Sequence, residues 1–215
     1  MRKSKQTFTD LVFILDRSGS MRGLERDTLS GFNEMIDKQK QEPGQALVTT
    51  VLFDDTRQML YLRRPLERLR PLDESQYYVR GCTALLDAIG QTIHDMTNCH
   101  KASERKRKVV MVIITDGLEN ASKRYSYLDV RDLIQRQKKR HDWEFIFLGA
   151  NMDAVEEAAK IGIHEERAGT YANDSRGLEV TYQAISEAVS CMRMGDTMHG
   201  EWKHIIEEDR QRRRD

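Results

Sequence analysis

The sequence predicts an α/β protein with a doubly wound, mostly parallel central sheet of about six strands flanked by helices, a Rossmann-like arrangement. Short apolar runs alternate along the chain with segments whose apolar residues recur at helical spacing. The two strongest runs, 11–15 and 109–114, show no polar alternation, as is typical of strands that are buried on both faces of a parallel sheet. Polar clusters follow both runs directly, where such sheets place their ligand-binding loops.

The other elements follow in the alternating order that βαβ units require. Helical spacing begins at Leu24 and stops before Pro43-Gly44, which ends that helix. The runs 46–53 and 58–62 flank Asp54-Asp55 and predict a hairpin. We expect an irregular stretch over 63–81 with at most a short helix, helices over 84–93, 128–139, 154–161 and 178–192, and strands over 144–148 and 167–171.

The totals predict one soluble domain with short extensions. The chain has 215 residues, of which 39% are hydrophobic and 33% are charged, and this leaves room for a sizeable core. We expect a basic N-terminal tail over 1–7, the folded domain over 8–194, and a charge-rich, solvated C-terminal extension over 195–215. The formal net charge of zero disfavours nucleic acid and membrane surfaces as partners.

Cysteine content and the N-terminus predict a cytoplasmic protein. Three scattered cysteines without a CxxC pair suit neither a disulfide framework nor a structural zinc site. The N-terminus is basic but lacks the apolar region of a secretion signal, and no stretch approaches the roughly 20 apolar residues of a membrane span.

Three polar clusters at predicted strand and helix ends carry the chemistry. Asp16, Ser18 and Ser20 follow the first strand, Thr83 begins a helix, and Asp116 follows the strongest strand. Residues i, i+2 and i+4 of an extended segment project to the same side, so the first three side chains can point at one centre. All five side chains offer oxygen, the ligand atom that Mg²⁺, Mn²⁺ and Ca²⁺ prefer over nitrogen or sulfur.

These residues resemble a known constellation. The string DxSxS, a threonine in a GxTAL context, and TDG after a hydrophobic strand are similar to the metal-ion-dependent adhesion site of von Willebrand factor type A domains. The same fold occurs as the integrin I domain and in many bacterial intracellular proteins. The resemblance covers the chain from about Phe8 to Met192, and all five motif positions are filled without substitution.

The resemblance implies a role for each residue. The hydroxyls of Ser18, Ser20 and Thr83 would contact a divalent cation, with Mg²⁺ expected and Mn²⁺ or Ca²⁺ as alternatives. Asp16 and Asp116 would act mainly through bound waters and by orienting the hydroxyls. Because neutral ligands leave the cation under-neutralised, a Glu or Asp from a partner protein would complete its coordination. The implied activity is recognition, with no bond broken.

Loops at the same sheet edge supply a basic and aromatic rim. Arg and Tyr are favoured at binding hot spots, so the rim predicts an acidic protein partner, although solvated loop residues or, for Asn151, a helix cap are the alternatives. The candidate rim residues are Arg17, Arg22, Tyr78, Arg80, Arg124 and Asn151.

Three other interpretations stay open. Asp16, Ser20 and Thr83 can cap helices while Asp116 begins a turn. Asp16 can serve as the nucleophile of a magnesium-dependent phosphoryl-transfer enzyme, although Ser18 stands where the haloacid-dehalogenase-like family has a second Asp. The binding module can be an adaptor or regulatory subunit for an ATPase, a kinase or a stress-response complex, which a cytoplasmic location favours over adhesion.

Overall fold

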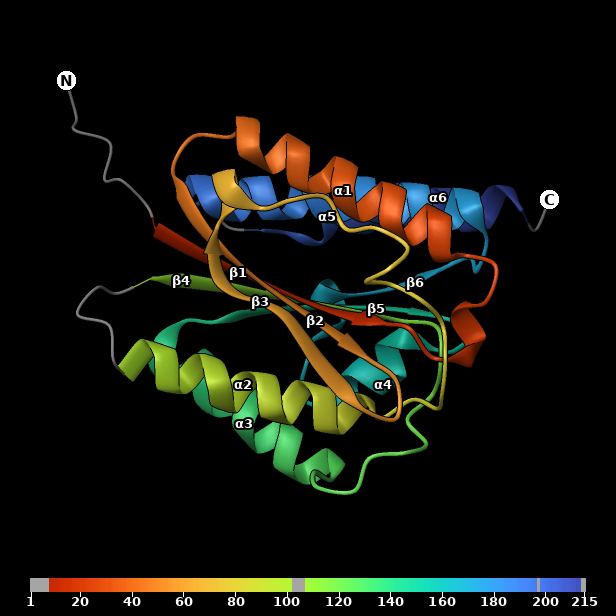
Figure 1. The fold of residues 1–215 in the computed structure, drawn as a ribbon, viewed down its shortest axis with the longest axis horizontal. Coiled ribbons are helices and arrows are strands. Elements are labelled where there is room, and N and C mark those ends of the chain that lie inside the picture. The colour runs from red at the N-terminus through yellow and green to blue at the C-terminus, as the bar shows by residue number, and fades with distance from the viewer. Residues whose placement is uncertain (1–7, 102–106, 197, 214–215) are drawn as a thin grey trace.

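The chain forms a six-stranded sheet with helices on both faces (Figure 1). This computed structural model describes residues 8–101, 107–196 and 198–213, so the basic tail over 1–7 lies outside the described residues. The strands are β1 (Phe8–Asp16), β2 (Gln45–Phe53), β3 (Arg57–Pro65), β4 (Lys108–Thr115), β5 (Glu144–Ala150) and β6 (Ala168–Tyr171). The α-helices are α1 (Glu25–Gln41), α2 (Leu85–Lys101), α3 (Tyr127–His141), α4 (Ala154–Lys160), α5 (Ser175–Met194) and α6 (His204–Arg212).

The sheet has the order β3-β2-β1-β4-β5-β6, and it confirms the predicted doubly wound architecture. β1 lies in the middle and pairs in parallel with β2 and with β4. β3 alone runs antiparallel, as the hairpin after β2 requires. From the second residue onward, β1 and β4 are buried along their whole length, which explains their uninterrupted apolar sequences.

The helices form two layers over the sheet. Figure 1 shows α1, α5 and α6 on one face and α2, α3 and α4 on the other. Each layer closes its own apolar core: Phe13 meets Phe32 of α1 edge to face at 5.4 Å on one side, and Ile113 packs in the cluster of α2 and α3 on the other. No helix among the described residues is both long enough and apolar enough to span a bilayer.

The strand order reverses between β1 and β4. The chain leaves β1 toward α1 on one face and leaves β4 toward α3 on the other, so the two loops diverge at the carboxyl ends of these neighbouring strands. A crevice at such a switch point is where open α/β sheets bind ligands. Both predicted aspartates, Asp16 and Asp116, lie at this point.

The C-terminal segment differs from its prediction as a solvated extension. A 3-10 turn at Gly200–Lys203 and α6 cover β6, and Trp202 and Ile206 are buried against it. A Cβ on Gly169 of β6 would lie 3.9 Å from each of these two side chains. The indole Nε1 of Trp202 donates to the carbonyl oxygen of Glu166 at 3.0 Å. Charge-rich composition misled the prediction, because two of the few apolar residues, Trp202 and Ile206, pack on β6.

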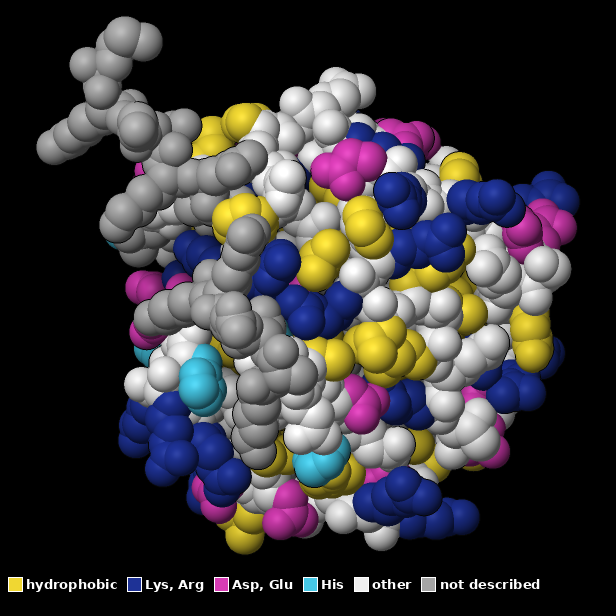
Figure 2. Space-filling view, turned by 60° about the vertical axis from the view of Figure 1, so that its left-hand side comes forward, with side chains coloured by type: hydrophobic (Ala, Val, Ile, Leu, Met, Phe, Trp, Pro, Cys, Tyr) yellow, Lys and Arg dark blue, Asp and Glu magenta, His cyan; other side chains and the backbone are white. Residues whose placement is uncertain are grey.

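The opposite edge of the sheet, where the parallel strands begin, carries charges of both signs. Figure 2 brings this side of the molecule forward and shows groups of Lys and Arg side chains between acidic and apolar ones. Among the described residues, charges of both signs are therefore interspersed on this face.

Candidate metal centre

The first loop of the site begins where β1 ends. Asp16 is buried, and its Oδ1 accepts a hydrogen bond from the backbone N–H of Ser18 at 2.7 Å. A 3-10 turn over Gly19–Met21 follows and brings the next serine round. As a result the hydroxyl oxygens of Ser18 and Ser20 lie 3.0 Å apart on the same side of the loop.

β4 brings the second carboxylate to the same place. The hydroxyl of Ser20 donates to Oδ1 of Asp116, 96 positions further along the chain. Thr115, the last residue of β4, donates its hydroxyl to Oδ2 of Asp16 at 2.6 Å. One hydrogen bond therefore runs from the loop after β1 to Asp116, and another runs from the end of β4 to Asp16.

Thr83 approaches from the loop before α2. A Cβ built on Gly117 would lie 2.7 Å from Oγ1 of Thr83 and 3.2 Å from Oγ of Ser20, so these two hydroxyls border the space above this glycine. Asn120 fixes the threonine backbone, since its Oδ1 accepts from Thr83 N at 2.9 Å and its N–H donates to Thr83 O at 3.0 Å. The structure thus brings together all five residues of the predicted metal set.

The donor set fits a hard divalent cation. Three hydroxyls and two carboxylates offer only oxygen, which Mg²⁺, Mn²⁺ and Ca²⁺ accept. Within the described residues, no group of three or more His, Cys, Asp or Glu side chains could hold a metal ion. Ser18, Ser20 and Thr83 would hold the cation, with the two aspartates beside them. The role of these residues as ligands stays a prediction of the sequence pattern.

Burial shapes the electrostatics of both aspartates. It raises the pKa of the Asp16 carboxyl to about 6, against the opposing hydrogen bonds from Thr115 and Ser18. Burial also raises the pKa of Asp116, against hydrogen bonds from Ser20 and Asn173. Two carboxylates that are costly to ionise suit a site that receives positive charge from outside the chain.

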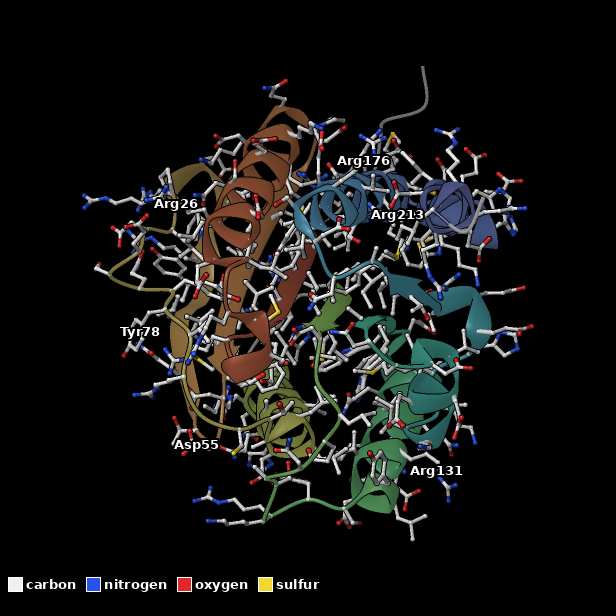
Figure 3. All side chains as sticks on the ribbon, turned by 90° about the vertical axis from the view of Figure 1, so that its right-hand side faces the viewer. Arg26, Asp55, Tyr78, Arg131, Arg176 and Arg213 are labelled. Atoms are coloured by element: carbon white, nitrogen blue, oxygen red, sulfur yellow. The ribbon has the colours of Figure 1, made fainter. Side chains whose placement is uncertain are left out.

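The rim residues divide into exposed and buried. Arg22 and Arg124 lie exposed on the loops after β1 and β4, Asn151 lies exposed after β5 with a left-handed backbone (φ 54°), and Tyr78 and Arg80 are exposed on the crossing before α2. Figure 3 looks onto this edge, with Tyr78 at its side.

Arg17 is wrong as a rim residue. Its side chain is 0% exposed, and its Nε donates to Oδ2 of Asp54 at 2.8 Å while Nη1 donates to Gln58 at 2.7 Å. Arg80 donates to the same Asp54 oxygen at 2.6 Å. Burial alone would raise the pKa of Asp54, but hydrogen bonds from Arg80 and Thr56 and the charge of Arg17 lower it to about 2.

Sequence reasoning missed Asn173. This residue follows β6, and its Nδ2 donates to Oδ2 of Asp116 at 3.2 Å. The signal was available, since a residue after a parallel strand reaches the same sheet edge. Glu119 caps α2, because its Oε2 accepts a hydrogen bond from the N–H of Leu86 in the first turn of that helix at 2.8 Å. Cys82 beside Thr83 is exposed.

Comparison with solved structures gives related folds of low identity. Proximal thread matrix protein 1 from the mussel byssus, with a zinc-occupied MIDAS motif, is 15% identical with a TM-score of 0.61, and the match covers 86% of this chain and 46% of that chain. The ArnB paralog VWA2 from Sulfolobus acidocaldarius is 23% identical with a TM-score of 0.55 and the same coverages of 86% and 46%. The manganese-loaded TRAP protein of Plasmodium vivax is 17% identical with a TM-score of 0.50, covering 67% and 57%.

This chain spans about half the length of these neighbours, and their likeness shows the shared fold. The comparison with curated proteins gives no match. A family profile for the von Willebrand factor type A domain matches residues 10–184, which include every residue of the predicted metal set. On this match, and on the doubly wound sheet that accompanies it, the chain belongs to the von Willebrand factor type A domain family.

Proposed function

We propose that this protein is a metal-dependent protein-binding module whose bound divalent cation accepts a carboxylate from a partner protein. The observation that carries the proposal is the meeting of three hydroxyls and two carboxylates from three separate loops at the switch point of the sheet. Family membership supports it, as do the zinc and manganese in the two structural neighbours named for them. Mg²⁺ is the expected cation, with Mn²⁺ and Ca²⁺ as alternatives.

The charges of the site favour an acidic ligand. Hydroxyl ligands carry no charge, so a divalent cation held by Ser18, Ser20 and Thr83 keeps most of its own. Ser20 is exposed to solvent, which leaves that side of the site open to a partner. When bound, the cation supplies electrostatic attraction for a carboxylate, and the protein holds the oxygens that keep the cation in place.

The exposed rim extends this preference beyond the cation. Arg22 and Arg124 are exposed on the two loops that also carry the aspartates. The guanidinium of Arg80 lies 5.6 Å from the ring centroid of Tyr78. This arrangement keeps the positive charge of Arg80 beside an aromatic ring at the surface. Replacing Arg22, Arg80 and Arg124 by Glu should slow association with an acidic partner, because rim charges act mainly on the association rate.

Phosphoryl transfer through Asp16 is the weaker candidate. A nucleophilic carboxylate must present an oxygen to its substrate. Here Oδ1 accepts from Ser18 N and Oδ2 accepts from the Thr115 hydroxyl, while the residue is 1% exposed. These contacts suit a carboxylate that orients its neighbours better than one that attacks a phosphate.

We place the module in the cytoplasm, as an adaptor or regulatory subunit of a larger assembly such as an ATPase, a kinase or a stress-response complex. Free thiols at Cys82 and Cys99 support a reducing compartment. The neutral total charge favours a protein partner over nucleic acid or a membrane surface.

Capture from native lysate tests the function. The bait is the wild-type protein in Mg²⁺, the same protein in chelator, and Asp116→Ala in Mg²⁺. Asp132→Ala, which removes an exposed aspartate from α3, is the matched control. We expect one partner to be retained by wild type and by Asp132→Ala in Mg²⁺ only, and to be displaced by a glutamate-rich peptide. Equal capture under all conditions would contradict the proposal.

A further inference from the structure

A polar connection leads from the metal centre toward the C-terminal helix. It starts at Asn173, whose Nδ2 donates to Oδ2 of Asp116 at 3.2 Å. A carboxylate only accepts, so the amide nitrogen must face it, and the orientation of this side chain is fixed. The contact occupies one oxygen of Asp116 and leaves Oδ1 to the hydroxyl of Ser20. Asn173 therefore sets the rotation of the carboxylate that stands beside the predicted cation.

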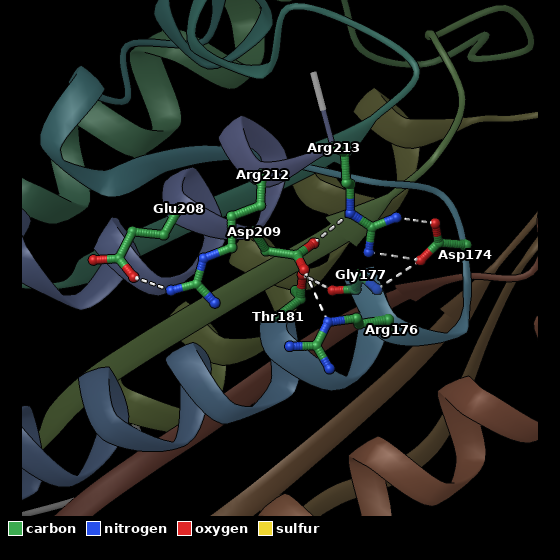
Figure 4. Close-up of polar contacts among 8 residues, drawn as sticks. All are labelled: Asp174, Arg176, Gly177, Thr181, Glu208, Asp209, Arg212 and Arg213. Atoms are coloured by element: carbon green, nitrogen blue, oxygen red, sulfur yellow. Dashed lines mark hydrogen bonds and ion pairs between the residues drawn. The ribbon is translucent and has the colours of Figure 1, made fainter. Parts of the chain in front are cut away.

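The next residue along the chain ties this loop to α6. Asp174 caps the N-terminus of α5, where its Oδ1 accepts from the N–H of Gly177 at 2.8 Å. Arg213, which follows α6, binds both oxygens of the same carboxylate, with Nη2 at 3.1 Å from Oδ1 and Nη1 on Oδ2 (Figure 4). A bidentate guanidinium fixes the plane of the carboxylate as well as its position.

α6 is itself held in place. Oδ2 of Asp209, a buried residue of α6, accepts from Nε of Arg213 at 2.7 Å, and Oδ1 accepts from Nε of Arg176 on α5 at 3.1 Å. Figure 3 shows Arg176 and Arg213 on the metal-site edge of the molecule. Together with the burial of Trp202 and Ile206 on β6, these pairs dock α6 beside the start of α5. α6 lies outside the family match, which ends at residue 184.

We propose that α6 is a positioning element of the metal centre: Arg213 holds Asp174, and through it the loop that presents Asn173 to Asp116. The inference rests on the proposed function, because it concerns the affinity of that same site. A partner that draws Arg213 away from Asp174 lowers the affinity for the cation. By reciprocity, the bound cation strengthens the docking of α6 by the same factor.

The expected coupling is modest. The side chains of Arg213 and Asp174 are 32% and 48% exposed, so solvent weakens their attraction, although the bidentate geometry and the link to Asp209 retain part of it. Asn173 touches the metal-site carboxylate directly. Its removal should therefore have the larger effect, as is usual for residues that orient metal ligands.

Calorimetric titration of the full chain with Mn²⁺ tests the connection. Asn173→Ala should weaken Mn²⁺ binding roughly tenfold, and Arg213→Ala about threefold. Arg212→Ala is the matched control, because Arg212 also lies on α6 but pairs with Glu208 of the same helix at 3.3 Å. It should leave the affinity unchanged. In the double variant Asn173→Ala/Arg213→Ala, the arginine should add nothing to the loss caused by Asn173→Ala.

Hydrogen exchange in chelator supplies a readout that needs no metal. Arg213→Ala should speed amide exchange over 172–177 relative to both wild type and Arg212→Ala. Equal Mn²⁺ affinity and equal exchange in Arg213→Ala and Arg212→Ala would overturn the inference while wild type still binds Mn²⁺. Additive losses in the double variant would overturn the route through Asn173. A wild-type protein that binds no Mn²⁺ would instead overturn the proposed function, and this inference with it.

Discussion

β1 carries a buried aspartate near each of its ends, and the two have opposite surroundings. Asp10 near the start of the strand is 1% exposed and meets the guanidinium of Arg63 and the imidazole of His100. Arg63 places Nε 3.2 Å from Oδ1 and Nη2 3.4 Å from Oδ2, and His100 places Nε2 2.9 Å from Oδ2. Here the protein provides the countercharge itself.

Asp16 at the other end is equally buried but meets only hydroxyl and amide donors. Among the described residues, no Lys, Arg or His nitrogen forms an ion pair with Asp16 or Asp116. Burial accordingly raises the pKa of the Asp16 carboxyl to about 6. The comparison teaches that the chain supplies a countercharge at one end of β1 and none at the other, which is the end where we propose that a cation binds.

Removing the charge of Asp10 should have the largest effect on stability. Asp10→Asn leaves the guanidinium of Arg63 without its counterion and should lower the free energy of unfolding by about 3 kcal/mol. The loss should be the same in Mg²⁺ and in chelator. Urea denaturation measures it, with the exposed Asp132→Asn as control. A loss no larger than that of the control would contradict a structural role for the ion pair of Asp10.

Removing the charge of Asp16 should not destabilise the metal-free protein. The raised pKa of Asp16 corresponds to about 3 kcal/mol of ionisation penalty at pH 7.5, of which a rearranged hydrogen bond offsets about 1 kcal/mol. Asp16→Asn should therefore be about 2 kcal/mol more stable than wild type in chelator, yet bind Mg²⁺ roughly a hundredfold more weakly. A variant that unfolds more easily in chelator would show that Asp16 is a structural carboxylate.

Acid should weaken cation binding at this end. In the folded protein the pKa of the Asp16 carboxyl is raised from its ordinary value of 3.8 to about 6. In chelator this group therefore makes stability fall as pH rises between these two values, because the folded state binds the proton more tightly. Protons then compete with the cation, and Mg²⁺ affinity should drop about tenfold from pH 7 to pH 5. A calorimetric affinity that is flat over this range would contradict the pKa.

A methyl group above the site should have the smallest of these effects. The Cβ in Gly117→Ala would lie 2.7 Å from Oγ1 of Thr83 and must push that hydroxyl aside. We expect about 1 kcal/mol of lost stability and Mg²⁺ binding weakened roughly fivefold. Gly200→Ala is the control, since a Cβ there meets nothing within 4 Å. Unchanged Mg²⁺ affinity in Gly117→Ala would show that the cation does not bind beside this glycine.

Much of this architecture was predictable because it follows from local patterns. The apolar runs around Ile14 and Ile113 define the central strands, and the residues that follow them must reach one edge of a parallel sheet. The sequence therefore predicts that Asp16 and Asp116 lie close together. The motif resemblance added Thr83, which no periodicity places beside them.

The rest depended on contacts that a sequence does not display. The polar turn around Arg17 predicts an exposed side chain, but an ion pair with Asp54 of the β2–β3 turn holds it in the interior. Asn173 belongs to none of the three polar clusters of the motif, and its contact with Asp116 depends on the course of the loop after β6. The many charged residues of α6 predict a solvated segment, but Ile206 is buried against β6.

Thermal unfolding at pH 7.5, in Mg²⁺ and in chelator, tests the central claim most directly. At a Mg²⁺ concentration roughly a hundredfold above Kd, binding contributes about 2.7 kcal/mol, which for a chain of this size raises Tm by about 5–10 °C. We predict this rise for wild type and for Asp132→Ala, and none for Asp116→Ala. An identical wild-type Tm in Mg²⁺, Mn²⁺ and chelator would contradict the account that the carboxyl end of β1 is built for a cation.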